Sequence, residues 1–429
     1  YGDKLVGTAY NTDLLDVLRK DMGYEGVIVT DWGVLNGGST DPDAMIGTAW
    51  GMDDVEDPVR IFEVLKNGID SLGGFNNVGP VMEAHDLWQK AYEAGEVSVD
   101  ADTRFRESGE RVIHMLMLGG LYENPYTDLE ASLATVGSDE FMKAGYDAQL
   151  ESIVVAKNSG AISCDAEQSW EGKKVYIPNT YNKGFDGLFG PASLVEGPSL
   201  SVEAAEAIFG AGNVVTDTPE LDAEGNVVSY TTPDLADVDV VLVGMDSPDN
   251  GSPFTQAGFD QETQSYYPLS LQYRPYTADG PNVRTTSIGG DTLADGSKEN
   301  RSYFGATSKI ANEADLDAFE RAVAAVEASG KDIPVIVALN AKNPVIPAEF
   351  EGKADAIVIG MGVSDSAMIE VALGLHESTG RLPQTYPANM DTVEANKEDV
   401  PFDLEAYVDS AGNAWEYGFG LSCDATPIK

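Results

Sequence analysis

The residue with the clearest chemical potential is Asp31, which closes a short apolar run. Residues 26–32 read Gly-Val-Ile-Val-Thr-Asp-Trp, and this non-alternating, β-branched pattern predicts a strand that is buried on both faces. A glycine-rich loop, residues 33–38, follows directly. Barrels of the α/β class place catalytic groups at the C-terminal ends of such strands. Asp31 is therefore a candidate catalytic carboxylate, and Trp32 offers an apolar face for a sugar ring.

Asp31 also has a purely structural interpretation. An aspartate at the end of a strand routinely caps the next helix or accepts a hydrogen bond from a loop N–H. Position alone leaves both interpretations open.

Carboxylates dominate the charged residues of the chain. Asp and Glu number 72 against 26 Lys and Arg, so the net charge is −46. A charge this negative excludes nucleic acid as a partner and disfavours anionic membrane surfaces. The hydrophobic fraction of 42% is that of a globular chain, and no apolar run approaches the roughly 20 residues of a membrane-spanning helix. We expect a soluble protein; its localisation stays open, and a secreted or cell-surface protein fits.

Histidine and cysteine chemistry is poorly represented. The histidines, His85, His114 and His376, lie far from one another in the sequence, which argues against a histidine-rich metal site or a Ser-His-Asp hydrolase. Cys164 and Cys423 lack the spacing of zinc ligands and are too few for a disulfide framework. We expect both to be idle or buried thiols.

The elements that must position Asp31 follow the rhythm of a β/α barrel. One helix is expected at 11–22 and another at 58–68, with a long amphipathic helix over 100–123 before a Pro-terminated stop. A complete barrel takes about 250 residues. We therefore predict that residues 1–125 form only the last units of a (β/α)8 barrel and its linker.

Residues 126–429 predict a second domain, a doubly wound α/β sandwich with a parallel sheet, because short apolar strands alternate with helices. The expected strands are 174–177, 238–243, 333–339 and 356–359. Helices are expected at 138–157 and 316–326, the latter ended by Gly330. The polar and aromatic segment 246–310 is irregular and long, which is typical of a functional loop.

Several segments resemble glycoside hydrolase family 3, in the order in which that family carries them. Residues 14–32 resemble its nucleophile segment, and residues 47–53 its Ala-Gly-x-Asp element. The run 111–126, with Leu-Tyr-Glu-Asn-Pro-Tyr, resembles its linker signature. Residues 151–158, Glu-Ser-Ile-Val-Val-Ala-Lys-Asn, resemble the start of its second domain. The runs Gly-Arg-Leu-Pro-Gln-Thr-Tyr-Pro and Glu-Tyr-Gly-Phe-Gly-Leu-Ser, residues 380–387 and 416–422, resemble its closing signatures.

This resemblance implies a retaining exo-acting β-glycosidase that hydrolyses β-linked glucosides or xylosides. In the family, a (β/α)8 barrel supplies the nucleophile and an α/β sandwich domain supplies the acid/base. Asp31 would then attack the anomeric carbon to form a glycosyl-enzyme, with Trp32 in contact with the substrate. The implied chemistry requires no metal and no organic cofactor.

The implied acid/base is the point at which the sequence departs from the family. The family places Glu before Gly-Tyr-Asp-Arg, whereas here Ala257 precedes Gly258. Glu262 lies in the same loop and is our acid/base candidate, although a solvated loop carboxylate is an equally good interpretation. Other carboxylates that would replace the missing Glu are Asp246, Asp249, Asp260 and Glu299.

A second departure concerns the barrel. The chain starts just upstream of the nucleophile strand, and the family's earlier barrel strands are not in it. We therefore expect a second polypeptide or a precursor segment to complete the barrel, because a buried-type strand leaves an unsatisfied edge.

The sequence also bears on two function classes other than a glycosidase. A carbohydrate-binding or structural homologue that has lost its acid/base is motivated by Ala257. A nucleotide-binding domain is poorly supported, because neither a Gly-x-Gly-x-x-Gly nor a phosphate-binding Gly-x-x-x-x-Gly-Lys-Ser/Thr motif occurs.

Overall fold

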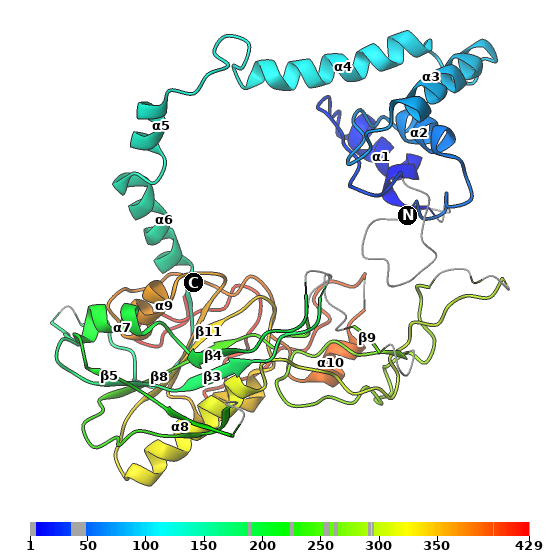
Figure 1. Cartoon of the computed structure of the whole chain (residues 1–429). Helices are drawn as coiled ribbons and strands as arrows, with labels where there is room; N and C mark the ends of the chain where they lie inside the picture. Colours follow the sequence, from blue (N-terminus) through cyan, green and yellow to red (C-terminus); the bar gives the residue numbers. More distant parts are fainter. Residues whose placement is uncertain are drawn as a thin grey trace. The chain divides into compact units, whose positions relative to one another are not determined.

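The structure is a computed structural model that divides the chain into two compact units, Tyr1–Val136 and Gly137–Lys429. Figure 1 follows the chain from its N-terminus to its C-terminus. The structure describes residues 6–35, 49–165, 167–187, 190–223, 227–251, 258–260, 265–290, 293, 296–397 and 399–428.

The described part of the first unit is built from helices and loops. The helices are α1 (Thr12–Asp16), continued by a π-helical turn (Val17–Asp21), then α2 (Asp57–Lys66), α3 (Val78–Glu93), α4 (Ala101–Leu118) and α5 (Leu129–Thr135), after a 3-10 turn at Thr8–Tyr10. The bounds of α1 with its π-helical turn and of α2 agree with the helices expected at 11–22 and 58–68, whereas α4 starts as expected and ends at Leu118, before the expected residue 123. The predicted barrel units remain a prediction, because no strand forms in the described residues of this unit.

Local sequence explains where the first helices start and stop. The Asn11 side chain accepts a hydrogen bond from the backbone N–H of Leu14 at 3.1 Å and so caps α1. Pro58 occupies the first turn of α2, where its missing N–H costs nothing. Gly68, just past the end of α2, has a φ of +87°, which favours glycine. The apolar side of α2 packs with Leu15 and Trp88 in one core.

The strand expected at 26–32 is not formed as predicted. Within the described part of the chain, the segment pairs only with residues 70–71, through an isolated parallel bridge between Val29 and Ser71. Val29 is 53% exposed, which a strand buried on both faces would not be. The expectation of a buried strand is therefore wrong for this structure, because the described residues cover only one edge of the segment.

The second unit contains a six-stranded sheet in the order β1-β12-β11-β8-β2-β5. Its strands are β1 (Val154–Asn158), β2 (Val175–Ile177), β5 (Val214–Thr216), β8 (Val240–Asp246), β11 (Val335–Asn340) and β12 (Ala356–Gly360). Neighbours from β12 to β5 pair in parallel, and β1 pairs antiparallel with β12. The expected central strands are thus confirmed, and the fold is mixed α/β with a sheet dominated by parallel strands.

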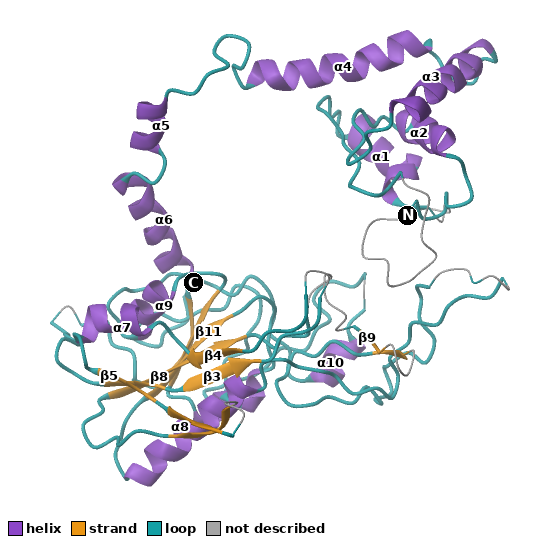
Figure 2. Cartoon of the chain, viewed as in Figure 1, coloured by secondary structure: helices purple, strands orange, loops and turns teal. Residues whose placement is uncertain are grey.

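Helices cover both faces of this sheet. Alternate residues of each strand belong to different cores: Val241 and Val337 pack with α8 (Ala314–Ser329), whereas Leu242 and Ile336 pack with α7 (Val202–Phe209) and α9 (Asp365–Ala372). Figure 2 shows α8 and the pair α7 and α9 on opposite sides of the strands. A central strand buried on both faces reads as a continuous apolar run, which is why these strands were predictable.

The remaining elements of the second unit are short. They are α6 (Asp139–Ser152), α10 (Met390–Ala395), two 3-10 turns (Pro347–Glu349 and Glu351–Lys353) and three two-stranded ribbons: β3 (Asn179–Asn182) with β4 (Val195–Pro198), β6 (Thr218–Leu221) with β7 (Val227–Thr231), and β9 (Phe259–Asp260) with β10 (Ser265–Tyr266). Apart from β9 and β10, the described part of the long segment 246–310 is irregular, as expected.

The helix expected over 138–157 is too long. The helix ends at Ser152, and Val154–Asn158 form the edge strand β1 instead. Burial decides this outcome, since Val154, Val155 and Ala156 are almost fully buried between the two cores. Tertiary packing of β-branched residues has overridden the helical pattern.

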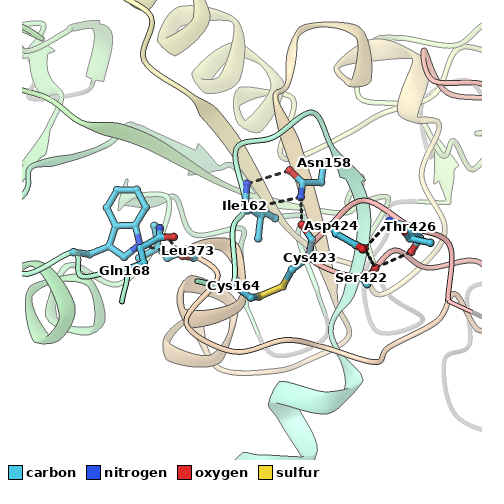
Figure 3. Close-up of a disulfide and its surroundings, with 10 residues drawn as sticks. Asn158, Ile162, Cys164, Gln168, Leu373, Ser422, Cys423, Asp424 and Thr426 are labelled. Atoms are coloured by element: carbon cyan, nitrogen blue, oxygen red, sulfur yellow. Dashed lines mark hydrogen bonds between the residues drawn. A yellow bond between two sulfur atoms is a disulfide. The ribbon is translucent and has the colours of Figure 1, made fainter. Parts of the chain in front are cut away.

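The expectation of idle thiols is also wrong. Cys164 and Cys423 form a disulfide, with their Cα atoms 5.7 Å apart. The Asn158 side chain supports both ends of this link: its Nδ2 donates to the carbonyls of Ile162 and Cys423, each at 2.9 Å (Figure 3). The disulfide therefore fastens the C-terminal segment to the loop that follows β1. A separation of 259 residues gives no local signal of the pairing.

Candidate active site

Asp31 lies at the end of a segment that is anchored by backbone hydrogen bonds. The N–H of Thr30 donates to the carbonyl of Ser71 at 3.1 Å, and the N–H of Asp70 donates to the carbonyl of Ile28 at 2.8 Å. The side chain of Asp31 is exposed, and its Oδ1 accepts from the N–H of Trp32 at 2.7 Å. The loop N–H interpretation and an accessible nucleophile are therefore compatible, because no hydrogen-bond donor among the described residues reaches the second carboxylate oxygen.

Trp32 presents its ring to solvent next to this carboxylate. Its side chain is 65% exposed. A Cβ on Gly74 would lie only 2.3 Å from the ring, so the glycine, at a φ of +64°, lets the backbone pass directly beneath the indole. An exposed indole with its underside fixed by backbone is a suitable platform for a sugar ring.

A buried carboxylate, Asp70, fastens the Asp31 segment to the helices. Asp70 Oδ2 accepts from the N–H of Ile28 at 3.1 Å and pairs with Arg19. Its Oδ1 pairs with Arg111 at 2.8 Å and lies 3.7 Å from Arg104. The Asp70 side chain has no exposed surface. One buried carboxylate therefore offsets part of the positive charge of three guanidinium groups and also holds the segment that carries Asp31.

Sequence reasoning missed this cluster. The arginines come from two separate elements, the π-helical turn (Arg19) and α4 (Arg104 and Arg111), and the packing of α4 against residues 68–71 brings them together. The available signal was weak: Ile69-Asp70-Ser71 comes shortly after the end of α2, beyond Asn67 and Gly68. Arg104, which is buried, also donates to the carbonyls of Leu65 and Ile69.

The proposed acid/base falls where the structure gives no description. Glu262 and Ala257 both lie outside the described residues. Glu262 belongs to the second unit and Asp31 to the first.

The alternative carboxylates are each engaged in hydrogen bonds. Asp246 Oδ1 accepts from Asn340 at 2.8 Å, and Asp249 Oδ2 accepts from Asn182 at 2.9 Å. These two side chains lie at the carboxyl end of β8 and in the loop after it.

Asp260 and Glu299 both accept from tyrosines. Asp260 accepts the hydroxyl of Tyr267, and Glu299 accepts that of Tyr266 at 2.8 Å. Glu299 is also paired with Arg301 at 2.6 Å.

A further carboxyl, which the sequence analysis did not select, lies beside Asp246. Asp315 accepts hydrogen bonds from Thr180 at 2.6 Å, from Asn312 at 2.8 Å and from the N–H of Asp246 at 2.9 Å. Burial raises the pKa of Asp315 to about 6, against the lowering effect of these donors. Its place in the first turn of α8 was visible in the sequence, but its burial was not.

Tyrosines of the long segment 246–310 have a structural role. Tyr273 is completely buried, and its hydroxyl donates to the carbonyl of Asp246 at 2.6 Å. Burial raises the pKa of Tyr273 well above its usual value. Tyr276 and Tyr303 both donate to Glu394. These tyrosines tie the long loop to the C-terminal segment.

Across the described ranges, no three His, Cys, Asp or Glu side chains gather in an arrangement that could hold a metal ion. None of the helices in the described part of the chain combines the length and apolar character of a membrane span.

Comparisons with known proteins find β-glucosidases as relatives of this chain. No family model matches the sequence. The chain is 25% identical over 413 residues to beta-glucosidase C of Emericella nidulans, covering 96% of this chain and 50% of that protein. It is 22% identical over 426 residues to a periplasmic beta-glucosidase/beta-xylosidase of Dickeya chrysanthemi, covering 97% and 49%.

Solved structures agree on the fold. A β-glucosidase from Listeria innocua in complex with isofagomine matches with a TM-score of 0.54 and 17% identity, over 97% of this chain and 50% of that one. A β-glucosidase involved in saponin metabolism from intestinal bacteria matches with a TM-score of 0.55 and 16% identity, over 96% and 53%. The chain spans about half the length of the curated relatives it matches. The resemblance to β-glucosidases that the motifs indicated is thus confirmed over nearly the whole chain.

Proposed function

We propose that this chain carries the nucleophile of a retaining exo-acting β-glycosidase and that Asp31 is that nucleophile. The observation that supports this most directly is the exposed Asp31 carboxylate, beside an exposed Trp32, at the end of a segment anchored to Asp70 and Ser71. Its sequence context resembles the nucleophile segment of glycoside hydrolase family 3.

The proposed reaction uses two carboxyl groups. Asp31 attacks the anomeric carbon while an acid, for which Glu262 is our candidate, protonates the leaving oxygen. A water then hydrolyses the glycosyl-enzyme, and the proposed acid, Glu262, now acts as the base that removes a proton from this water. Retaining enzymes hold these groups about 5–5.5 Å apart. The mechanism needs no metal or organic cofactor.

The proposed substrates are β-linked glucosides or xylosides, cleaved from the non-reducing end. This follows the names of the relatives, a beta-glucosidase C and a beta-glucosidase/beta-xylosidase. A neutral substrate also suits a chain of net charge −46, which would repel anionic ones.

We further propose that a second polypeptide segment completes the barrel around Asp31. Val29 and Trp32 are exposed although they flank the candidate nucleophile, and the matched relatives are about twice as long. Coexpression with the N-terminal half of a relative should give a complex well above 45.6 kDa with activity on aryl β-glycosides. Full activity from a monomer of this chain alone would contradict the proposal.

Export from the cytoplasm is part of the same proposal. Disulfides such as Cys164–Cys423 persist in oxidising compartments. One relative, from Dickeya chrysanthemi, is named as periplasmic.

The competing proposal is a carbohydrate-binding or structural homologue without turnover, which the alanine at position 257 favours. Azide distinguishes the two. An enzyme that keeps its nucleophile but lacks an acid/base still cleaves activated aryl glycosides and transfers the sugar to azide. No cleavage of any aryl glycoside by the completed complex would support the non-catalytic homologue.

The direct test is covalent labelling. A 2-fluoro glycoside should trap a glycosyl-enzyme, and mass spectrometry of the completed complex should find the sugar on the peptide that contains Asp31. Asp31→Asn should abolish labelling and turnover while preserving the fold, because the amide is nearly isosteric but is not a nucleophile. Labelling of any other carboxylate would remove Asp31 from this role.

A further inference from the structure

A pocket of about 260 Å³ opens at the carboxyl edge of the six-stranded sheet, within the second unit. It lies where β8 and β11 end, next to β3 and the start of α9, elements that Figure 1 labels. Its polar lining consists of Thr180, Ser199, Asp246, Asp315, Asn340 and Asp365. None of these belongs to the segment that carries Asp31.

The topology of the sheet favours a ligand at this place. From β2 the chain moves through α7 to β5 on one side, and it then returns to β8 on the other side of β2. Adjacent strands whose connections leave in opposite directions define a topological switch point. Open α/β sheets bind ligands in the crevice outside the carboxyl ends of the strands at such a point.

The floor of the pocket is fixed by close packing. Gly244, within β8, would place a Cβ 1.9 Å from the carbonyl oxygen of Ser199, so any larger residue would displace the segment that lines the pocket. Asn340 is held on both sides: its Nδ2 donates to Asp246 Oδ1 at 2.8 Å, and its Oδ1 accepts from the N–H of Gly362 at 3.0 Å. The polar groups are therefore pre-organised.

Some of these polar groups keep hydrogen-bonding capacity for a ligand. Asp246 uses Oδ1 for Asn340, and Asp365 uses Oδ2 for the N–H of Ser201 at 2.7 Å. Among the described residues, no hydrogen-bond partner reaches Oδ2 of Asp246 or Oδ1 of Asp365. Asn340 has a second Nδ2 hydrogen to donate. Two acceptors and a donor therefore belong to residues that line one cavity.

Charge and size narrow the ligand class. Carboxylates line the pocket, and its described lining includes no Lys or Arg, so a phosphate or a carboxylate is disfavoured. The described residues offer no metal-type cluster, and the lining also supplies amide and hydroxyl donors. Each sugar hydroxyl can both donate and accept hydrogen bonds, so a sugar matches this mixture of hydrogen-bond donors and acceptors. A volume of about 260 Å³ lies below the roughly 300–1,000 Å³ of drug-sized sites, which suits one ring.

We propose that this pocket, bounded by Asp246, Asn340 and Asp365, is a second ligand site that binds one neutral monosaccharide, independently of the nucleophile at Asp31. Hydroxyl groups of the sugar would donate to the two available carboxylate oxygens and accept from the Asn340 amide. The site would exist even if the chain had no glycosidase activity.

The test measures D-glucose binding to the full chain by saturation-transfer NMR and calorimetry. Asp246→Ala and Asn340→Ala should each raise the dissociation constant at least tenfold. Asp239→Ala is the matched control. Asp239 directly precedes β8, at the end of the strand opposite Asp246. Its Oδ2 accepts one hydrogen bond, from the N–H of Lys174 at 2.8 Å. The Asp239→Ala variant should bind glucose as tightly as the original chain, and circular dichroism should show that all three variants fold.

Further ligands and one more variant make the outcome decisive. Cellobiose should bind no more tightly than glucose if the pocket holds one ring, and glucose 6-phosphate should not compete. Competition by calcium chloride or propylammonium at equal strength would overturn the neutral-sugar assignment. Glucose binding should persist in Asp31→Asn. Loss of binding in that variant, with normal binding in Asp246→Ala, would place the sugar at the nucleophile and refute a second site.

Discussion

Arg111 Nη1 lies 2.8 Å from Oδ1 of Asp70, a carboxylate whose side chain has no exposed surface. The same carboxylate accepts the backbone N–H of Ile28 through its other oxygen. The pairing therefore connects α4, the longest helix of the first unit, to the segment that ends at Asp31. This relationship makes Asp70 a positioning residue for the proposed nucleophile.

Asp70→Ala should destabilise the first unit by about 3–5 kcal/mol, because it leaves buried guanidinium groups without their counter-charge. In urea unfolding, fluorescence of Trp88, which is buried in the same core, should report the loss. In the completed complex, kcat should fall more than KM rises, since the Asp31 segment loses an anchor. Arg111→Gln is the matched control: Arg111 is 29% exposed, and its removal should cost much less. Equal effects of the two variants would contradict a central role for Asp70.

Glu262→Ala should affect substrates according to their leaving group. General-acid help is typically worth about 10²–10⁴-fold, and only a basic leaving oxygen needs the proton. The rate on an alkyl glycoside should therefore fall by that range, while a dinitrophenyl glycoside should be cleaved at nearly the original rate. Asp279→Ala, at an exposed position of the same long segment, serves as a control and should leave both rates unchanged. A small and equal effect on both substrates would return Glu262 to a solvated loop carboxylate and direct attention to Asp260 or Asp246.

The disulfide should contribute measurably to the stability of the second unit. It closes a loop of 259 residues, and removing a native disulfide typically costs about 2–5 kcal/mol. Cys164→Ser combined with Cys423→Ser should lower the thermal midpoint, and a reductant should lower it for the original chain only. Alkylation of the denatured chain should modify no cysteine before reduction and both afterwards. A free thiol in the unreduced chain would disprove the pairing.

Asp315 should make stability depend on pH in a defined direction. Its folded pKa of about 6 lies above the usual aspartate value of 3.8, so the folded state holds the proton more tightly than the unfolded state. The stabilisation by protonation is thus full below about pH 4 and is lost as the pH rises through 6, a change of about 3 kcal/mol.

The measurement compares unfolding free energies of the original chain and of Asp315→Asn between pH 4 and pH 7. The variant should be less stable throughout, since an amide cannot accept all the hydrogen bonds that Asp315 receives. The difference in unfolding free energy between the original chain and the variant should narrow as the pH rises, because only the original chain loses the proton. Asp317→Asn, on the same helix but with a side chain 48% exposed, should show no such narrowing. A constant gap for Asp315→Asn would show that its carboxyl is ionised at all these pH values.

Local sequence determined the elements whose signals lie within a few residues. The continuous apolar runs of β8, β11 and β12 became central strands because a strand covered on both faces needs an apolar residue at every position. Helix α8 ends at Gly330, whose φ of +65° is a left-handed conformation that glycine adopts without a penalty. The motifs around Asp31 likewise identified the candidate nucleophile and the β-glucosidase resemblance.

Tertiary structure alone decided the contacts between residues far apart in the chain. The Cys164–Cys423 disulfide, the antiparallel edge strand β1 and the arginines around Asp70 all depend on packing across long sequence separations. The raised pKa of Asp315 depends on burial, which no local pattern of charged residues reveals. The physical reason is common to all four. Desolvation and pairing energies are properties of what surrounds a side chain in space, whereas composition and periodicity describe only its neighbours along the chain.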